Sequence, residues 1–148
     1  MDADSTISDL NPEVVRELVT RARSVRENSY SPYSRFRVGA AVLSRSGRIF
    51  SGCNVENASY GLTICAERSA LCQATAAGCR DIIAVCISLE GTPLPCGACL
   101  QCICEFNPKT LLLLDNSLNP PDIAPEQVSL ELLLPRPFLL DRPSSVTR

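Results

Sequence analysis

The sequence predicts an α/β fold, a three-layer α/β/α sandwich with a central mixed sheet of about five strands. Two adjacent β-rich runs predict a hairpin, and the strands and helices after them alternate, an order typical of a mixed sheet covered by helices. A length of 148 residues is that of one compact domain. We therefore expect a single domain over residues 1–148, with its core at residues 12–138 and short flexible tails.

The first part of the chain predicts a helix and then a hairpin. Residues 12–28 place apolar side chains at spacings of three and four, which form one face of a helix, and Asn11 suits its N-cap. Residues 36–43 and 48–54 are β-rich, and the S-R-S-G stretch between them is typical of a hairpin turn.

The middle of the chain predicts a helix followed by a buried strand. Residues 64–77 are rich in helix-forming side chains and are followed by Gly78, a typical helix end. Residues 81–89 contain a run of β-branched and other apolar side chains, which is typical of a strand buried on both faces.

The last part of the chain predicts a helix, a strand and a second helix. Residues 96–106 have helical character and end before the N-P pair at 107–108. Residues 110–115 are a short apolar strand. After a proline-rich connection we expect a final helix near residues 126–134.

Composition limits the partners. The chain has 14 Lys and Arg against 16 Asp and Glu, and the basic residues are scattered, so it offers no basic surface for a nucleic-acid backbone. No apolar run approaches the roughly 20 residues that span a bilayer, and residues 1–7 lack the features of a signal peptide. We expect a cytoplasmic protein that binds a small, neutral or weakly polar molecule, and neither nucleic acid nor membrane.

The chain has no histidine and nine cysteines. The absence of imidazole excludes Ser-His-Asp and Cys-His catalytic groups and every zinc site that needs a histidine ligand. An odd number of cysteines without a secretion signal argues against a disulfide framework. A zinc ion bound by this chain would therefore be held by thiolates or carboxylates.

Three of the cysteines lie in two motifs that begin predicted helices. The C-A-E motif begins with Cys65, and the P-C-G-A-C motif supplies Cys96 and Cys99. A helix N-terminus lowers the pKa of a thiol and so favours the thiolate that binds metal. Three protein ligands leave one coordination position open, which is the arrangement of a catalytic zinc. Glu67 follows Cys65 closely enough to reach a water at that position and exchange protons with it.

Together the two motifs match the H-x-E…P-C-x-x-C signature of zinc deaminases, with cysteine in the first position. With the further segments 30–41, 52–60 and 132–135, the chain resembles the small, all-cysteine, homotetrameric cytidine deaminases over residues 12–138. The resemblance implies hydrolytic deamination of cytidine and 2′-deoxycytidine to uridine and 2′-deoxyuridine, with release of ammonia, in pyrimidine salvage. It also implies one Zn²⁺ per subunit and Glu67 as the catalytic proton carrier.

The resemblance further implies which residues bind the nucleoside. Asn54 and Glu56 correspond to the residues that hold the ribose 3′-hydroxyl. Phe36 corresponds to the aromatic that packs on the pyrimidine ring, and Ala66 to a residue whose backbone contacts the base edge.

Other residues are implied to act through the assembly or the metal. Ala58 and Tyr60 correspond to residues that a neighbouring subunit contributes, and Phe138 to an aromatic that closes over a neighbour's pocket. Arg68 corresponds to a donor of hydrogen bonds to the zinc thiolates. There it would offset the net negative charge that three thiolates leave on Zn²⁺.

The chain departs from the family pattern in four places, two of which concern the expected pocket. Leu100 stands where arginine is usual and Leu94 where serine is frequent, and we expect both at the pocket rim. An aminohydrolase for another amino-pyrimidine nucleoside, such as blasticidin S, therefore stays open. So does a zinc-stabilised module without turnover, which would need a fourth ligand, and Cys102 is its nearest candidate.

Overall fold

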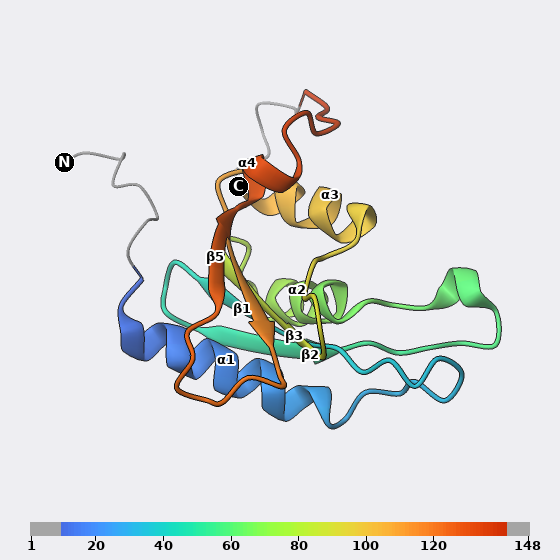
Figure 1. Cartoon of the computed structure of the whole chain (residues 1–148). Coiled ribbons are helices and arrows are strands. Elements are labelled where there is room, and N and C mark those ends of the chain that lie inside the picture. The colour runs from blue at the N-terminus through green and yellow to red at the C-terminus, as the bar shows by residue number, and fades with distance from the viewer. Residues whose placement is uncertain (1–9, 142–148) are drawn as a thin grey trace.

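The computed structural model describes residues 10–141, in which a five-stranded mixed sheet lies between helices (Figure 1). This confirms the expected α/β/α architecture and the expected number of strands. Most of the predicted flexible tails, residues 1–9 and 142–148, lies outside the described residues. No helix among residues 10–141 combines the length and the apolar character needed to cross a membrane.

The sheet has the strand order β2-β1-β3-β4-β5. β1 pairs antiparallel with β2 and β3, β3 and β4 run parallel, and β5 runs antiparallel to β4 at the edge. The strands are β1 (Gly39–Ser44), β2 (Ile49–Cys53), β3 (Ile82–Leu89), β4 (Leu111–Asn116) and β5 (Glu126–Ser129).

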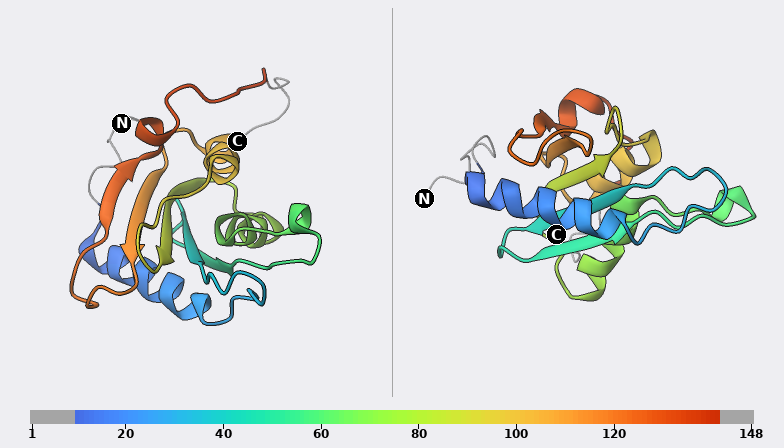
Figure 2. Two further views of the ribbon diagram at one scale, coloured as in Figure 1. Left: turned by 45° about the vertical axis from the view of Figure 1, so that its right-hand side comes forward. Right: turned by 60° about the horizontal axis from the view of Figure 1, so that its bottom comes forward.

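The helices divide between the two faces of the sheet (Figure 2). α1 (Pro12–Arg26) covers one face, and Asn11 caps it as expected, its Oδ1 accepting from the amide of Glu13 at 2.8 Å. The other face carries α2 (Ala66–Ala76), α3 (Gly97–Phe106) and the single turn α4 (Leu130–Leu133). Each face therefore has its own apolar core, and the sheet separates them.

The predicted helix near residues 126–134 is wrong over its first half. Residues 126–129 form strand β5, and only Leu130–Leu133 are helical. The edge of β4 offers free backbone groups, and pairing with Leu111–Leu114 satisfies them and buries Val128 against the core. These non-local hydrogen bonds outweigh the local helical preference of the segment.

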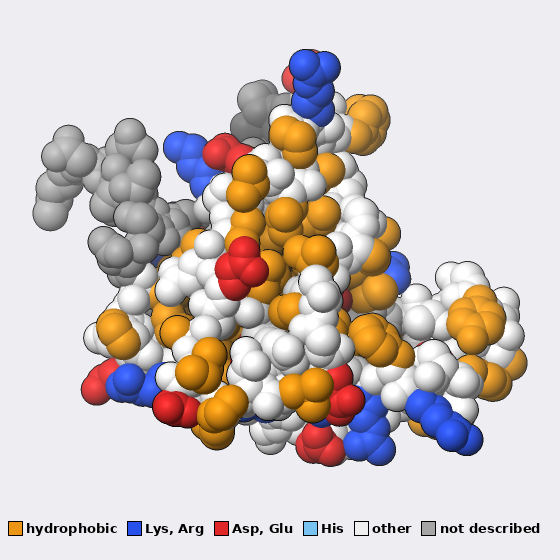
Figure 3. Space-filling view, in the orientation of Figure 1, with side chains coloured by type: hydrophobic (Ala, Val, Ile, Leu, Met, Phe, Trp, Pro, Cys, Tyr) orange, Lys and Arg blue, Asp and Glu red, His pale blue; other side chains and the backbone are white. Residues whose placement is uncertain are grey.

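Two segments extend together beyond the sheet, residues 28–38 and 54–65, and they form a projection (Figures 1 and 2). A bridge between Tyr30 and Val55 joins them, and the rings of Tyr33 and Tyr60 lie 6.4 Å apart. The short helix η1 (Tyr60–Leu62), which the sequence did not predict, forms the tip. Hydrophobic side chains are exposed at this tip (Figure 3).

Candidate active site

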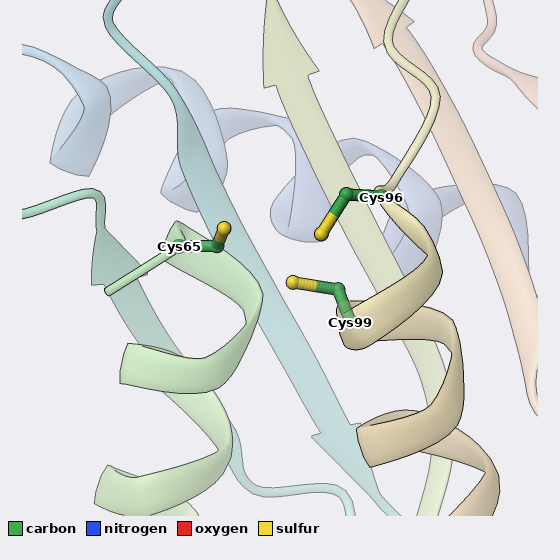
Figure 4. Close-up of side chains that lie close together, drawn as sticks. All are labelled: Cys65, Cys96 and Cys99. Carbon is green, nitrogen blue, oxygen red and sulfur yellow. The ribbon is translucent and has the colours of Figure 1, made fainter. Parts of the chain in front are cut away.

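The three motif cysteines meet at the starts of two helices. Cys65 is the N-cap of α2, Cys96 is the N-cap of α3, and Cys99 lies in the first turn of α3. Their sulfur atoms all lie within 4.8 Å of one another and point into the space between the helices (Figure 4). Cys99 is buried, Cys65 is half-buried and Cys96 is exposed, so the cluster is open on one side.

A close contact between β2 and α2 sets the position of the first of these helices. A Cβ on Gly52 would lie 2.3 Å from the backbone nitrogen of Ala70 and 2.8 Å from the carbonyl oxygen of Ala66. Glycine therefore lets the strand touch the helix backbone directly. This contact fixes the first turn of α2, which carries Cys65 and Glu67, against the sheet.

The electrostatics of the cluster suit a thiolate-bound metal. A hydrogen bond from Cys99 lowers the pKa of the Cys65 thiol, and Arg68 lowers it further. Within the described residues, the group of side chains able to hold a metal consists of Cys65, Cys96 and Cys99 and does not include Cys102. Three soft sulfur ligands, with the Arg68 guanidinium beside them, fit a Zn²⁺ ion that keeps one coordination position open.

Arg68 lies in the first turn of α2, and its side chain reaches back to the cluster. Its Nη2 is 3.8 Å from the sulfur of Cys65 and donates to the carbonyl oxygen of Thr63 at 3.2 Å. The guanidinium is thus held beside the thiolate that it would compensate.

Glu67 occupies the first turn of α2 and is 4% exposed. Burial raises the pKa of its carboxyl above the ordinary value. Ala66, the first helical residue, is fully buried next to it. The structure therefore brings together five of the predicted residues, Cys65, Cys96, Cys99, Glu67 and Arg68.

A second group of predicted residues lies at the base of the projection. Asn54 is buried, and its Nδ2 donates to the carbonyl of Phe36 at 2.7 Å. Its Oδ1 accepts from the amide of Val38 at 2.9 Å and from the hydroxyl of Ser29 at 2.5 Å. The Asn54 amide thus fixes the backbone on both sides of residue 37 and leaves the Phe36 ring half exposed.

Glu56 reaches across the projection to the same loop. Its Oε2 accepts from the amides of Tyr33 at 2.9 Å and Ser34 at 3.2 Å, and its Oε1 accepts from the Ser34 hydroxyl. The hydrogen bond from that hydroxyl is the main cause that lowers the pKa of the Glu56 carboxyl. The group is therefore an ionised hydrogen-bond acceptor at neutral pH.

The remaining predicted residues lie on the surface. Ala58 is exposed just before the tip of the projection, and Tyr60 is 68% exposed at the tip. Phe138 is 70% exposed, although its backbone is bound to Gln101 of α3.

Three residues differ from what the sequence predicted for the site. Leu100, expected at the pocket rim, is buried in the core under α2 and α3, whereas Leu94 is exposed. The roles of Ser34 and Gln101 were missed, because the Glu56 carboxylate and the Phe138 backbone, to which they bond, are distant in sequence. The only local signal was a serine two residues before Phe36, a spacing at which a hydroxyl can bond the backbone.

Comparisons with known proteins agree with this geometry. Residues 12–114 match the family described as the cytidine and deoxycytidylate deaminase zinc-binding region. A cytidine deaminase from Sporosarcina psychrophila is 47% identical over 94 residues, which cover 62% of this chain and 69% of that protein. One from Halalkalibacterium halodurans is 50% identical over 93 residues, covering 62% and 70%. The crystal structure of cytidine deaminase from Burkholderia pseudomallei superposes with a TM-score of 0.76 and 43% identity, covering 82% of this chain and 97% of that one.

Proposed function

This chain belongs to the cytidine and deoxycytidylate deaminase family, and on that premise we propose that it catalyses the hydrolytic deamination of cytidine and 2′-deoxycytidine. The products are uridine or 2′-deoxyuridine and ammonia, and the enzyme is a hydrolase acting on the C–N bond of a cyclic amidine. The observation that carries the proposal is the convergence of three cysteine sulfurs beside the buried Glu67. The whole chain acts as one deaminase domain. The enzyme works in the cytoplasm, where its reaction belongs to pyrimidine salvage.

Cys65, Cys96 and Cys99 would hold one Zn²⁺ per subunit. When bound, zinc supplies a Lewis acid that makes water more acidic. Arg68 offsets the negative charge of the three thiolates from its position beside Cys65.

Glu67 moves the protons. It takes a proton from the attacking water and delivers it to the ring nitrogen as the water oxygen bonds to C4. It then takes the second proton from the resulting C4 hydroxyl and delivers it to the amine, which leaves as ammonia while the C4 carbonyl forms. Cytidine and one water thereby become uridine and one ammonia. The buried position of Glu67 in the first turn of α2 supports this role, because the carboxyl is held next to the metal ligands and away from bulk water.

The residues at the base of the projection bind the nucleoside. Phe36 packs on the pyrimidine, Ala66 offers a backbone group to the base edge, and Asn54 and Glu56 hold the ribose 3′-hydroxyl. The half-exposed ring of Phe36 and the ionised carboxylate of Glu56 support this arrangement. The Asn54 Oδ1 and one of its two Nδ2 hydrogens already bond within the chain, so the second Nδ2 hydrogen is left for the sugar.

The active form is a homotetramer in which neighbours complete each site. Ala58 and Tyr60 on the projection, and Phe138 near the end of the described chain, reach into adjacent sites. Their exposure in one chain supports this, because such apolar surface is normally covered. Light scattering should give a mass of four chains, and a monomer that retains full activity would contradict the assembly.

The test is a deamination assay that follows the change in ultraviolet absorbance of cytidine, 2′-deoxycytidine and blasticidin S. We expect turnover of the first two, abolished by a chelator and restored by Zn²⁺. Turnover of blasticidin S alone would overturn the cytidine assignment in favour of the alternative aminohydrolase. Zinc K-edge spectroscopy separates the enzyme, with three sulfurs and one oxygen around zinc, from a structural module with four sulfurs.

A further inference from the structure

Ser34 joins two residues that the proposed function places on opposite parts of the substrate. Its hydroxyl donates to Oε1 of Glu56, which faces the sugar in the proposed function. The Ser34 hydroxyl oxygen also accepts from the amide of Phe36, the residue proposed for the base, at 3.0 Å. One donor and one acceptor of a single hydroxyl thus connect the sugar-binding carboxylate with the base-binding aromatic.

The loop that carries Ser34 has an unusual backbone. Arg35, between Ser34 and Phe36, has a φ of 59°, in the left-handed region that side chains other than glycine rarely adopt. Such a conformation persists where surrounding contacts hold it. Here the amide of Arg35 donates to the carbonyl of Ser31 at 3.0 Å, and the turn brings the Ser34 hydroxyl back to the Phe36 amide.

The hydrogen bonds that Glu56 already accepts limit how many more it can make with a substrate. A carboxylate offers about four acceptor positions. Three are taken, by the amides of Tyr33 and Ser34 and by the Ser34 hydroxyl. One position is left, which matches a single sugar hydroxyl.

We propose that Ser34 is a positioning residue that holds the Glu56 carboxylate and the Phe36 ring at the spacing of a nucleoside's sugar and base. The inference rests on the proposed function, since it needs Glu56 to bind the sugar. Ser34 itself does not touch the reacting atoms. It belongs to neither apolar core and is exposed, so its hydroxyl serves the orientation of these two side chains rather than the folding of the chain.

The test compares Ser34→Ala, Ser34→Thr and Ser31→Ala with the wild type, on cytidine and on 3′-deoxycytidine. Ser31→Ala is the control from the same loop, because among residues 10–141 its hydroxyl bonds to the Ser29 hydroxyl and not to Glu56 or Phe36. For Ser34→Ala we expect KM for cytidine to rise about tenfold, the effect of losing one hydrogen bond to a charged group. We expect kcat to change little, because the cysteine cluster and Glu67 lie on α2 and α3. Ser34→Thr keeps the hydroxyl and should restore KM.

The substrate comparison separates positioning from general loop stabilisation. On 3′-deoxycytidine, which lacks the hydroxyl proposed for Glu56, the ratio of KM between Ser34→Ala and wild type should be clearly smaller than on cytidine. An equal ratio on both substrates, or a large fall in melting temperature, would overturn the inference, because the role would then be structural. An unchanged KM in Ser34→Ala with normal wild-type turnover overturns this inference alone. Absence of wild-type turnover of cytidine overturns the proposed function as well.

Discussion

The side-chain amide of Gln101 pairs with both backbone groups of Phe138. Its Nε2 donates to the Phe138 carbonyl at 2.7 Å, and its Oε1 accepts from the Phe138 amide at 3.2 Å. The end of the described chain is thereby bound to α3, the helix that carries Cys96 and Cys99. Because the backbone is held, the exposed Phe138 side chain starts from a defined place beside α3.

Replacing Gln101 by alanine should release this segment. The two hydrogen bonds are exposed, so we expect faster hydrogen–deuterium exchange around residue 138 and a rise of a few-fold in KM for cytidine, with little change in overall stability. Mass spectrometry of exchanged peptides and steady-state kinetics measure the two effects. Gln127→Ala, on the exposed side of β5, is the control. Unchanged exchange near residue 138 in Gln101→Ala would show that the pairing does not hold the segment.

Glu67→Gln should separate zinc binding from proton transfer. The substitution keeps the size of a buried side chain and leaves the three cysteines intact. We therefore expect a folded protein with normal zinc content and a fall in kcat of about 10²–10⁴-fold or more, the usual contribution of general acid–base catalysis. Glu131→Gln on the surface of α4 serves as control. Substantial turnover by Glu67→Gln would rule out the proton-carrier role.

The three cysteine ligands should each be needed for zinc. Cys65→Ala, Cys96→Ala and Cys99→Ala each leave two sulfurs of the cluster, too few to hold the ion tightly. Metal analysis of purified protein should find zinc lost in all three and retained in Cys72→Ala, which changes an exposed cysteine of the same helix as Glu67. Full zinc occupancy in any of the three cluster variants would remove that cysteine from the ligand set.

Local patterns carried most of what the sequence could predict. The C-A-E and P-C-x-x-C motifs begin helices, and helix starts depend on neighbouring residues, so the placement of Cys65, Cys96 and Cys99 followed from spacing. Features that depend on distant partners were missed or misassigned. Strand β5 forms because β4 lies beside it, and Ser34 and Gln101 act on Glu56 and Phe138, far away in sequence. The expected position of Leu100 at the pocket rim was wrong, because its burial depends on how α3 packs on the sheet, which neighbouring residues in the sequence do not show.

Gly52→Ala tests the contact that positions the first turn of α2. An added Cβ would lie 2.3 Å from the Ala70 backbone nitrogen, and backbone atoms cannot move aside as a flexible side chain can. We expect the free energy of unfolding to fall by about 1–3 kcal/mol, measured by urea denaturation, and zinc affinity to fall with it. Gly61→Ala, whose Cβ would meet open space at the tip of the projection, should cost less than about 0.5 kcal/mol. Equal stability of the two variants would mean that strand and helix separate easily, and that the direct contact does not fix the metal ligand and the proton carrier at the start of α2.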